Sequence, residues 1–340
     1  MTVTDPFDVV NDEQMPSLRL ALDPKIVKQE FKRGLPRIAD DGLCKVKSIS
    51  VTRYKPGRRC VIEYDCRIEQ PDQKREKIIF IGKVRAKRFG NEGYRLLDEF
   101  WNAGFDAKSA DGISVPEPVA VLPDFKMWLQ RKVRGQSATD LFTPESGTDL
   151  AKQIATAAHK IHSAKIPVEK IFRMTDELRI LRECFVKVAE LKPELAARLE
   201  RVSAACVRLG EKLPEPTLVG IHRDFYPAQI IVGDARLWIL DFDLYCLGDA
   251  GLDIGNFLGH LTEQSLRCFG DANALSASKQ ALEEKFVELA GEGTRDSVRT
   301  YALLTLARHI FLSTKFEERQ KLTEALLALT EERLVDAGMI

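Results

Sequence analysis

Three side chains that carry oxygen donors lie close together in the second half of the sequence. Asp224 follows a histidine-arginine pair, Gln229 comes five residues later, and Asp241 ends an apolar run. Transfer of a phosphoryl group needs a carboxylate that orients the acceptor hydroxyl, and oxygen ligands that hold Mg²⁺ against the nucleotide phosphates. These three residues have the chemistry for both tasks.

The chain between Gln229 and Asp241 has the pattern of a β-hairpin. Two apolar runs, IIV and LWIL, are separated by the turn sequence GDAR, which is typical of two short strands joined by a tight turn. A hairpin returns the chain to its starting point, so we expect Gln229 and Asp241 to lie near one another. Asp224 would then sit on the loop before the first strand.

Alternation of apolar and polar residues from Lys45 to Arg85 predicts three antiparallel strands. The first two strands would be joined through YKPGRR and the second pair through QPDQKRE, and both have the composition of turns. Two more strands are predicted at VPEPVAVLPD and FKMWLQRKV.

Helices are predicted on both sides of these last strands. A short helical segment is expected from Asp23 to Gly34, and NEGYRLLDEFWNAG has apolar residues at helical spacing and ends at a glycine. From about Thr143 onward helical periodicity dominates, with one β interruption at residues 218–242. A sheet followed by helices predicts an α+β fold with a ligand in the cleft between two lobes.

Composition predicts a globular protein that stays away from polyanions and membranes. The 340 residues are 44% hydrophobic, and 51 basic residues balance 51 acidic ones, so no global field would attract nucleic acid or an anionic membrane. The acidic N-terminus does not resemble a secretion signal, which predicts a cytoplasmic protein. The seven scattered cysteines form no CxxC pair and are expected to be reduced thiols. The sequence carries no signal for an oligomeric state.

The sequence HRDFYPAQ, followed by LDFD and DIGNFL, resembles the aminoglycoside phosphotransferase and choline kinase family, which is distantly related to protein kinases. The resemblance implies a bilobal protein-kinase-like fold with a small antiparallel sheet in the N-lobe and a larger, mostly helical C-lobe. It divides the chain into an N-terminal extension (1–40), an N-lobe with hinge (41–134) and a C-lobe (135–340).

The resemblance also assigns roles to the acidic residues. Asp224 would be the catalytic carboxylate, Asp241 would bind the metal, and Asp253 would brace the catalytic loop, in which His222 is structural. Asp243 stands where the family often has an acidic residue, and is a further metal-ligand candidate.

Gln229 departs from the family, most of which has asparagine at this position. Glutamine keeps the amide oxygen but adds a methylene group, so it can bind metal only if the loop backbone shifts slightly.

In the N-terminal half, Lys83 in FIGKVR resembles the lysine that contacts the nucleotide phosphates. Glu92 at the start of the next helix resembles its ion-pair partner, with Glu99 as the alternative. The hinge would lie from Gln130 to Val133, with Lys132 inside it, and its backbone would recognise adenine.

The turn YKPGRR occupies the place of the glycine-rich loop over the phosphates. It has the single glycine Gly57, and Arg58 and Arg59 are candidates for contact with phosphate. Solvated hairpin charges are the alternative interpretation of these two arginines.

The activity implied is phosphorylation of a hydroxyl on a small molecule, with ATP and Mg²⁺ as cofactors. The acceptor could be an aminoglycoside, an amino sugar, a sugar or an amino alcohol such as choline. From Asn256 onward 13 acidic residues face 10 basic ones, a surplus too small to require a polycationic acceptor.

Three other interpretations of the sequence were weighed, and two of them are disfavoured. A nucleotide-binding regulatory protein without catalysis would explain Gln229 and the sparse phosphate loop. A protein kinase is disfavoured, because the gap between Asp241 and Asp253 leaves no room for an activation loop. His159 and His162 are spaced like a metal pair on a helix, but packing is the better interpretation, because no third ligand is apparent.

Overall fold

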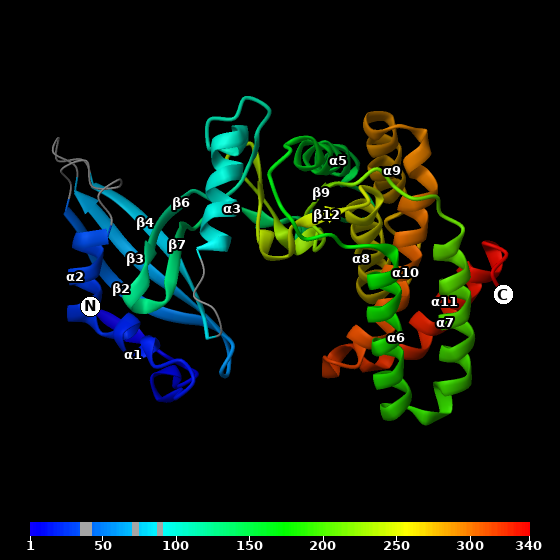
Figure 1. Cartoon of the computed structure of the whole chain (residues 1–340), viewed down its shortest axis with the longest axis horizontal. Helices are drawn as coiled ribbons and strands as arrows, with labels where there is room; N and C mark the ends of the chain where they lie inside the picture. Colours follow the sequence, from blue (N-terminus) through cyan, green and yellow to red (C-terminus); the bar gives the residue numbers. More distant parts are fainter. Residues whose placement is uncertain (35–42, 70–74, 87–90) are drawn as a thin grey trace. The chain divides into compact units, whose positions relative to one another are not determined.

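The structure is a computed structural model that describes residues 1–34, 43–69, 75–86 and 91–340 (Figure 1). The chain divides into two compact units, Met1–Arg134 with Gly233–Leu240, and Gly135–Val232 with Asp241–Ile340. Each unit has its own hydrophobic core. The boundary expected at residue 40 lies outside the described residues, and the three-part division of the chain stays a prediction.

The first unit is built on a six-stranded sheet with the order β1-β2-β3-β4-β7-β6. The strands are β1 (Thr2–Thr4), β2 (Leu43–Lys55), β3 (Arg59–Glu69), β4 (Arg75–Arg85), β6 (Pro118–Leu122) and β7 (Met127–Arg131). The five strands predicted from the sequence are confirmed, and all neighbours among them are antiparallel. The expected turn at residues 70–74 lies outside the described residues.

The edge strand β1 corrects the expectation of a purely antiparallel sheet, because it runs parallel to β2. All three of its residues are exposed. Such a short exposed strand lacks the alternation of buried and exposed positions on which a strand prediction depends.

Helices α1 (Ser17–Leu22) and α2 (Pro24–Gly34) pack against the sheet (Figure 1). Alternate residues of β3 are buried, from Cys60 through Tyr64 to Ile68, as expected for a strand with one face in the core. The Tyr64 ring lies 4.9 Å from that of Phe31 on α2, and its hydroxyl donates to the Ala21 carbonyl at 2.9 Å. The helix predicted at residues 23–34 is thus confirmed.

The remaining elements of the first unit follow the sheet. Helix α3 (Glu92–Phe100) confirms the predicted amphipathic helix and ends through the π-turn η2 (Trp101–Phe105), in which Gly104 has φ 88°. Strand β5 (Ile113–Ser114) lies parallel to β11 (Arg236–Ile239).

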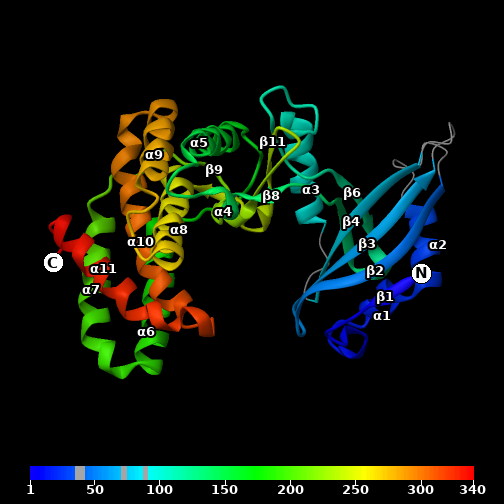
Figure 2. The same ribbon diagram turned by 180° about the vertical axis from the view of Figure 1, so that it is seen from behind.

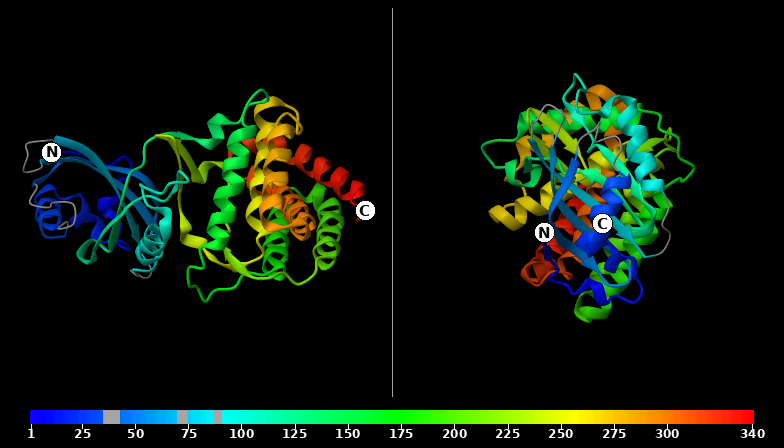
Figure 3. Two further views of the ribbon diagram at one scale, coloured as in Figure 1. Left: turned by 90° about the horizontal axis from the view of Figure 1, so that it is seen from above. Right: turned by 90° about the vertical axis from the view of Figure 1, so that its left-hand side faces the viewer.

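The second unit is largely helical, as predicted. Its helices are α4 (Ala138–Leu141), α5 (Thr148–Ser163), α6 (Met174–Leu191), α7 (Ala196–Glu211), α8 (Gly251–Phe269), α9 (Ser276–Ala290), α10 (Arg295–Ser313) and α11 (Thr323–Asp336). In Figures 2 and 3 the C-terminal helix α11 (red) lies beside α7 (green). None of the helices in the described ranges is both long and apolar enough to cross a bilayer.

Short strands join these helices. They are β8 (Gln136–Ser137), β9 (Val219–Ile221), β10 (Ile230–Gly233) and β12 (Cys246–Gly248). β8 pairs with β10, and β9 with β12, both antiparallel. Short 3₁₀ turns are η1 (Val9–Asn11), η3 (Pro123–Phe125), η4 (Pro193–Leu195), η5 (Pro227–Gln229), η6 (Phe242–Leu244), η7 (Glu292–Thr294) and η8 (Glu317–Leu322).

Helices α8 and α10 approach closely because α8 presents glycines to its neighbour. A Cβ atom on Gly255 would lie 2.5 Å from the Tyr301 Cβ and 2.7 Å from the Ala302 amide nitrogen. A Cβ on Gly259 would lie 2.6 Å from the Thr305 Cβ. The position of α8, which starts next to the catalytic loop, therefore depends on these small residues.

Candidate active site

The loop that carries Asp224 and the segment that carries Asp241 leave the same end of a two-stranded ribbon. Ile221, the last residue of β9, is opposite Cys246, the first residue of β12. Because the strands are antiparallel, the residues after Ile221 and those before Cys246 lie at one end. The rings of His222 and Phe242 are 4.8 Å apart. Asp224 is two residues beyond the first ring, and Asp241 directly precedes the second.

Asp253, fully buried near the start of α8, holds the loop that carries Asp224 in place. Its carboxylate accepts hydrogen bonds from the backbone amides of His222 at 2.8 Å and Arg223 at 2.6 Å. This geometry matches the bracing role that the resemblance implied.

His162 on α5 completes this arrangement, and sequence reasoning did not find its role. Its Nε2 lies 2.9 Å from Asp253 Oδ2, the oxygen that also accepts from the His222 amide, and the ring is buried. No group of three or more histidine, cysteine, aspartate or glutamate side chains that could hold a metal occurs in the part of the chain that the structure describes. The interpretation of His162 as a packing residue missed its contact with Asp253.

Asn256, one helical turn beyond Asp253, is a second brace that was missed. Its Nδ2 donates to the Phe225 carbonyl at 3.0 Å, and its Oδ1 accepts from Arg308 on α10 at 2.6 Å. The signal was present in DIGNFL, because residues three apart on a helix share a face. Two polar residues on one face of the otherwise apolar first half of α8 indicate a polar partner.

The backbone adopts a left-handed conformation at two points of this site. Arg223 has φ 70° and Asp241 has φ 63°. For a residue with a Cβ this conformation costs about 1–2 kcal/mol, and it is common at functional sites. Two contacts hold this conformation at Arg223. Its amide donates to Asp253, and its guanidinium lies 3.9 Å from the centre of the Phe172 ring.

Gln229 lies in η5, and its side chain is directed toward Asp224. The residue is buried, and its Nε2 donates to Asp224 Oδ2 over 3.4 Å, while Asp224 itself is partly exposed. A side-chain amide has one donor end and one acceptor end. With the nitrogen on Asp224, the amide oxygen is available for another partner, such as a hard cation.

The donor set around Asp241 fits Mg²⁺. Asp241 is half-buried, whereas Asp243 on η6 is exposed. Mg²⁺ is commonly bound by one or two protein oxygens together with water and substrate phosphates. The Asp241 carboxylate and the Gln229 amide oxygen have this donor chemistry, and their joint binding of a metal stays a prediction. A cluster of three acidic residues is not required for this kind of site.

A cavity of about 500 Å³ opens beside Asp224. It is lined by residues of the catalytic loop and of α8 and α10, among them Asp224, Tyr226, His260, Arg308 and His309. This volume lies within the ordinary range for pockets that bind small molecules.

The charges of this cavity are largely compensated. Its lining contains four arginines (Arg223, Arg267, Arg308 and Arg319) and three carboxylates (Glu177, Asp224 and Glu263). Glu177 pairs with Arg308 at 2.9 Å, and Glu263 with Arg267 at 2.8 Å. Arg319 lies 3.8 Å from Glu263. Apart from Asp224, the lining therefore holds no carboxylate without a cation beside it.

Two neutral histidines form another part of the wall. Burial lowers the pKa of His309 to about 3, and the positive charges of nearby arginines add to this effect. Burial also lowers the pKa of His260 well below its usual range. The Tyr226 ring stacks on His260 with 4.5 Å between centroids. This wall is aromatic and uncharged at neutral pH.

In the first unit, Trp128 joins Lys83 to the start of α3. Lys83 lies on β4, and its Nζ is 5.0 Å from the centre of the Trp128 ring. Glu92 is the first residue of α3, and a Cβ on the next residue, Gly93, would lie 3.2 Å from Trp128 Nε1. Lys83 and Gly93, the residue after Glu92, thus both lie close to one indole, which sequence reasoning did not identify. The pairing of Lys83 with Glu92 stays a prediction.

Two of the predicted hinge residues, Gln130 and Lys132, make contacts within the sheet of the first unit. Gln130 is buried in β7, opposite Ile81. The Lys132 ammonium pairs with Glu63 at 2.8 Å, and its amide donates to the Ile79 carbonyl at 2.8 Å. Recognition of adenine by this segment stays a prediction.

The turn between β2 and β3 is held by an aspartate from the N-terminal segment. The Gly57 amide donates to Asp12 Oδ2 at 2.9 Å, and the Tyr54 hydroxyl donates to the same oxygen at 2.7 Å. Burial acts to raise the pKa of Asp12, but these hydrogen bonds lower it overall. Arg58 and Arg59 are exposed. The one glycine amide of the turn is therefore bound to a carboxylate.

The chain was compared with known families and structures. A model of a family described as "Phosphotransferase enzyme family" matches residues 94–285. No curated protein matches the chain.

Solved structures with the same fold include three small-molecule kinases. Choline kinase from Cryptosporidium parvum has a TM-score of 0.56 at 13% identity, over 94% of this chain and 98% of its own. The aminoglycoside phosphotransferase APH(4)-Ia has a TM-score of 0.56 at 15% identity, over 92% and 98%. A glucosamine kinase in complex with glucosamine, ADP and inorganic phosphate has a TM-score of 0.53 at 15% identity, over 76% and 78%.

These likenesses confirm the protein-kinase-like fold, with its sheet-rich first part and mostly helical second part. The family model covers more than half of the 340 residues, including the catalytic loop, Asp241 and Asp253. The chain belongs to the phosphotransferase enzyme family.

Proposed function

We propose that the protein is an ATP- and Mg²⁺-dependent phosphotransferase that phosphorylates a hydroxyl group of a small molecule. The observation that carries the proposal is the position of Asp224, on a loop braced by Asp253 and at the wall of a cavity of about 500 Å³. A carboxylate at this position can orient or deprotonate an acceptor hydroxyl that lies in the cavity.

The other site residues have roles around the nucleotide in this proposal. Asp241 and Gln229 hold Mg²⁺, with Asp243 as a further ligand candidate, and the metal neutralises charge on the transferring phosphoryl group. Lys83 binds the nucleotide phosphates, and Glu92 positions the Lys83 side chain. Arg58 and the segment that contains Gln130 and Lys132 contribute to the nucleotide site.

The solved neighbours support a nucleotide and a small acceptor. A thermostable mutant of APH(4)-Ia is described as a ternary complex with ADP and hygromycin B, and the glucosamine kinase structure contains glucosamine and ADP. In this proposal residues 41–134 bind the nucleotide, residues 135–340 bind the acceptor, and 1–40 form an extension. The reaction takes place in the cytoplasm and involves neither nucleic acid nor a membrane.

The charges beside Asp224 favour a neutral or singly charged acceptor. A polycationic aminoglycoside would need several carboxylates without partners, and in the cavity Glu177 and Glu263 are already paired with arginines. The stacked Tyr226 and His260 rings suit the apolar face of a sugar. Within the proposed range of acceptors, a sugar or an amino sugar therefore fits better than an aminoglycoside.

Consumption of ATP in the presence of candidate acceptors tests this function. Sugars, amino sugars, amino alcohols and aminoglycosides are supplied separately, with and without Mg²⁺, to the purified protein and to the Asp224→Asn variant. We expect ADP formation that depends on one acceptor class and on Mg²⁺, and that is lost in the variant. Turnover of an acceptor that the variant performs equally well would refute the role of Asp224.

A nucleotide-binding regulatory protein without catalysis is the second candidate. The hydrogen bond from the Gly57 amide to Asp12 favours it, because that amide is then not available to a phosphate. Calorimetry of ATP binding with and without Mg²⁺, in the native protein and in Asp12→Ala, separates the two. Binding that ignores Mg²⁺, without any turnover in either protein, would support the regulatory function.

A further inference from the structure

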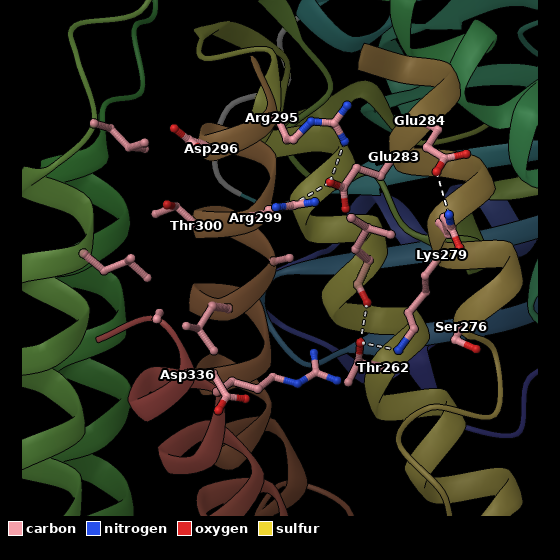
Figure 4. A pocket seen from close by; sticks show the side chains of 18 of the residues that line it. Thr262, Ser276, Lys279, Glu283, Glu284, Arg295, Asp296, Arg299, Thr300 and Asp336 are labelled. Carbon is pink, nitrogen blue, oxygen red and sulfur yellow. Dashed lines mark hydrogen bonds and ion pairs between the residues drawn. The ribbon is translucent and has the colours of Figure 1, made fainter. Parts of the chain in front are cut away.

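A second cavity, of about 850 Å³, lies among helices α7 to α11 (Figure 4). None of the residues that line it also lines the cavity beside Asp224. It is formed by Leu258 and Thr262 of α8, Ser276 and Lys279 of α9, several residues of α10, and Arg333 of α11. The phosphotransferase chemistry proposed above makes no use of it.

Lys279 is a largely enclosed cation in this cavity. Its Nζ donates to the Ala272 carbonyl at 2.9 Å and contacts Thr262 Oγ1 at 3.5 Å (Figure 4). Over the described ranges of the chain, no carboxylate oxygen lies within 4.0 Å of this nitrogen. Burial lowers the pKa of Lys279 to about 8, and the positive charge of Arg333 acts in the same direction, against the opposing charge of Asp271.

Arg333 is the second cation. Burial lowers the pKa of its guanidinium, against the opposing charges of Glu332 and Asp336. Neither of these carboxylates, nor any other in the chain as described, lies within 4.0 Å of the Arg333 side-chain nitrogens. Two half-buried positive charges thus act on one another inside one cavity, and among the described residues neither has a carboxylate within ion-pair distance.

Three of the other charged residues of the cavity are paired with one another. Glu283 accepts from Arg295 at 3.2 Å and from Arg299 at 2.7 Å (Figure 4). Glu284 accepts from Gln280 at 2.6 Å. Lys212, Asp296 and Asp336 complete the charged lining. Asp336 is exposed, so water screens its attraction to the charges of Lys279 and Arg333.

We propose that this cavity binds a small molecule that carries a phosphate group, and that Lys279 and Arg333 contact the phosphate. A phosphate monoester has a charge of about −1.5 to −2 at pH 7, which matches two enclosed cations better than a monocarboxylate does. The N-terminus of α9 at Ser276 also lines the cavity, and the helix dipole is positive there. Helix α8 forms a wall of this cavity and of the one beside Asp224.

Calorimetric titration of the full chain with inorganic phosphate tests this site. The variants are Lys279→Met and Arg333→Met, with Lys279→Arg to retain the charge. Arg299→Gln is the matched control, because Arg299 lines the same cavity but is already paired with Glu283. Acetate at equal concentration serves as the monocarboxylate probe.

We expect saturable phosphate binding that weakens about tenfold or more in each methionine variant, as for the loss of one charge-assisted hydrogen bond. Arg299→Gln and Lys279→Arg should retain it. Thermal unfolding adds a second readout: phosphate should raise the melting temperature of the native protein but not of Lys279→Met.

Three results would overturn the proposal: no saturable phosphate binding by the native protein, unchanged affinity in both methionine variants, or acetate binding as tight as that of phosphate. If phosphate bound only at the nucleotide site, its affinity would be unchanged in both methionine variants. None of these outcomes depends on turnover, so the site and the proposed phosphotransferase function can fail independently.

Discussion

Asp253 is the residue on which the catalytic loop depends most. It is fully buried and accepts hydrogen bonds from two backbone amides and from His162. These three donors come from two segments that precede it in the chain by 30 to 91 residues. One carboxylate therefore fixes the loop on which Asp224 lies.

Replacement of Asp253 by alanine should both destabilise the protein and lower its activity. The buried amides of His222 and Arg223 would lose their acceptor, at a cost of about 3 kcal/mol in the free energy of unfolding. Urea denaturation and turnover measure the two effects. Asp149→Ala, at a side chain that is 90% exposed, is the control, with an expected loss below about 1 kcal/mol. Equal stability of the two variants would contradict the bracing role.

The candidate site residues could be proposed from a local pattern in the sequence, whereas two residues that hold the surrounding backbone could not. Asp224, Gln229 and Asp241 follow one another in a short stretch with a recognisable pattern. His162 and Asp12 act on partners that are 91 and 45 residues away. A sequence read along the chain shows their types, but only folding shows that each meets its partner.

At the scale of elements, the contact of α8 with α10 positions the site. Both Asp253 and Asn256 lie on α8, and Asn256 accepts from Arg308 of α10. The glycines of α8 allow this distance between the helices, because a larger residue at Gly255 would meet backbone atoms of α10.

Gly255→Ala should therefore lower the stability of the second unit. The added methyl group would lie 2.7 Å from both the Ala302 nitrogen and the Val298 oxygen, and neither can move away alone. Overpacking of this kind costs about 1–3 kcal/mol. Chemical denaturation checks this against Gly293→Ala, where a Cβ meets nothing within 4 Å. The same stability for both alanine variants would show that α8 and α10 can separate without cost.

The histidines between α8 and α10 should make the protein sensitive to acid. The pKa of His309 is lowered to about 3 from its usual 6.5, so the unfolded chain takes up a proton below pH 6.5 that the folded chain does not. This contribution to stability is complete above pH 6.5 and declines as the pH falls toward 3, by about 1.4 kcal/mol per pH unit.

His260, whose pKa is also lowered, adds to the same slope. Unfolding free energies measured from pH 7 to pH 4 test this, with His309→Gln as the variant in which the slope should decrease. A slope that is identical in the native protein and the variant would mean that His309 is protonated in the fold.

Element prediction succeeded where one period extends over many residues. The long strands β2 to β4 and the helices after Thr148 have such periods. Strand β1 and helix α1 have three and six residues, too few for a period to be distinguished. They form because the core of the first unit and the edge of β2 offer them partners.

At the scale of the whole molecule, an even charge balance conceals local sites. The chain has 51 basic and 51 acidic residues. Even so, the cavity beside Asp224 holds paired charges, and the cavity between α7 and α11 holds two cations without carboxylate partners among the described residues. The composition of the whole chain cannot indicate where such local groups of charges lie.

The fold itself follows from the order of its patterns. A strand-rich first part, one inserted helix and a helical second part were expected from periodicity, and the family motif connected this order to the kinase-like fold. The acceptor could not be predicted in the same way. It depends on which side chains from distant helices meet in one cavity.

The central claim is that two carboxylates have separate roles: Asp224 orients the acceptor hydroxyl, and Asp241 binds the metal. Calorimetric titration of ATP with and without Mg²⁺, in the native protein, Asp224→Asn and Asp241→Asn, tests it most directly when turnover is measured on the same samples. We predict that Asp224→Asn binds Mg²⁺ and ATP normally but does not turn over, whereas in Asp241→Asn the gain in ATP affinity from Mg²⁺ is lost. Undiminished turnover in Asp224→Asn, or an unchanged effect of Mg²⁺ in Asp241→Asn, would contradict the account.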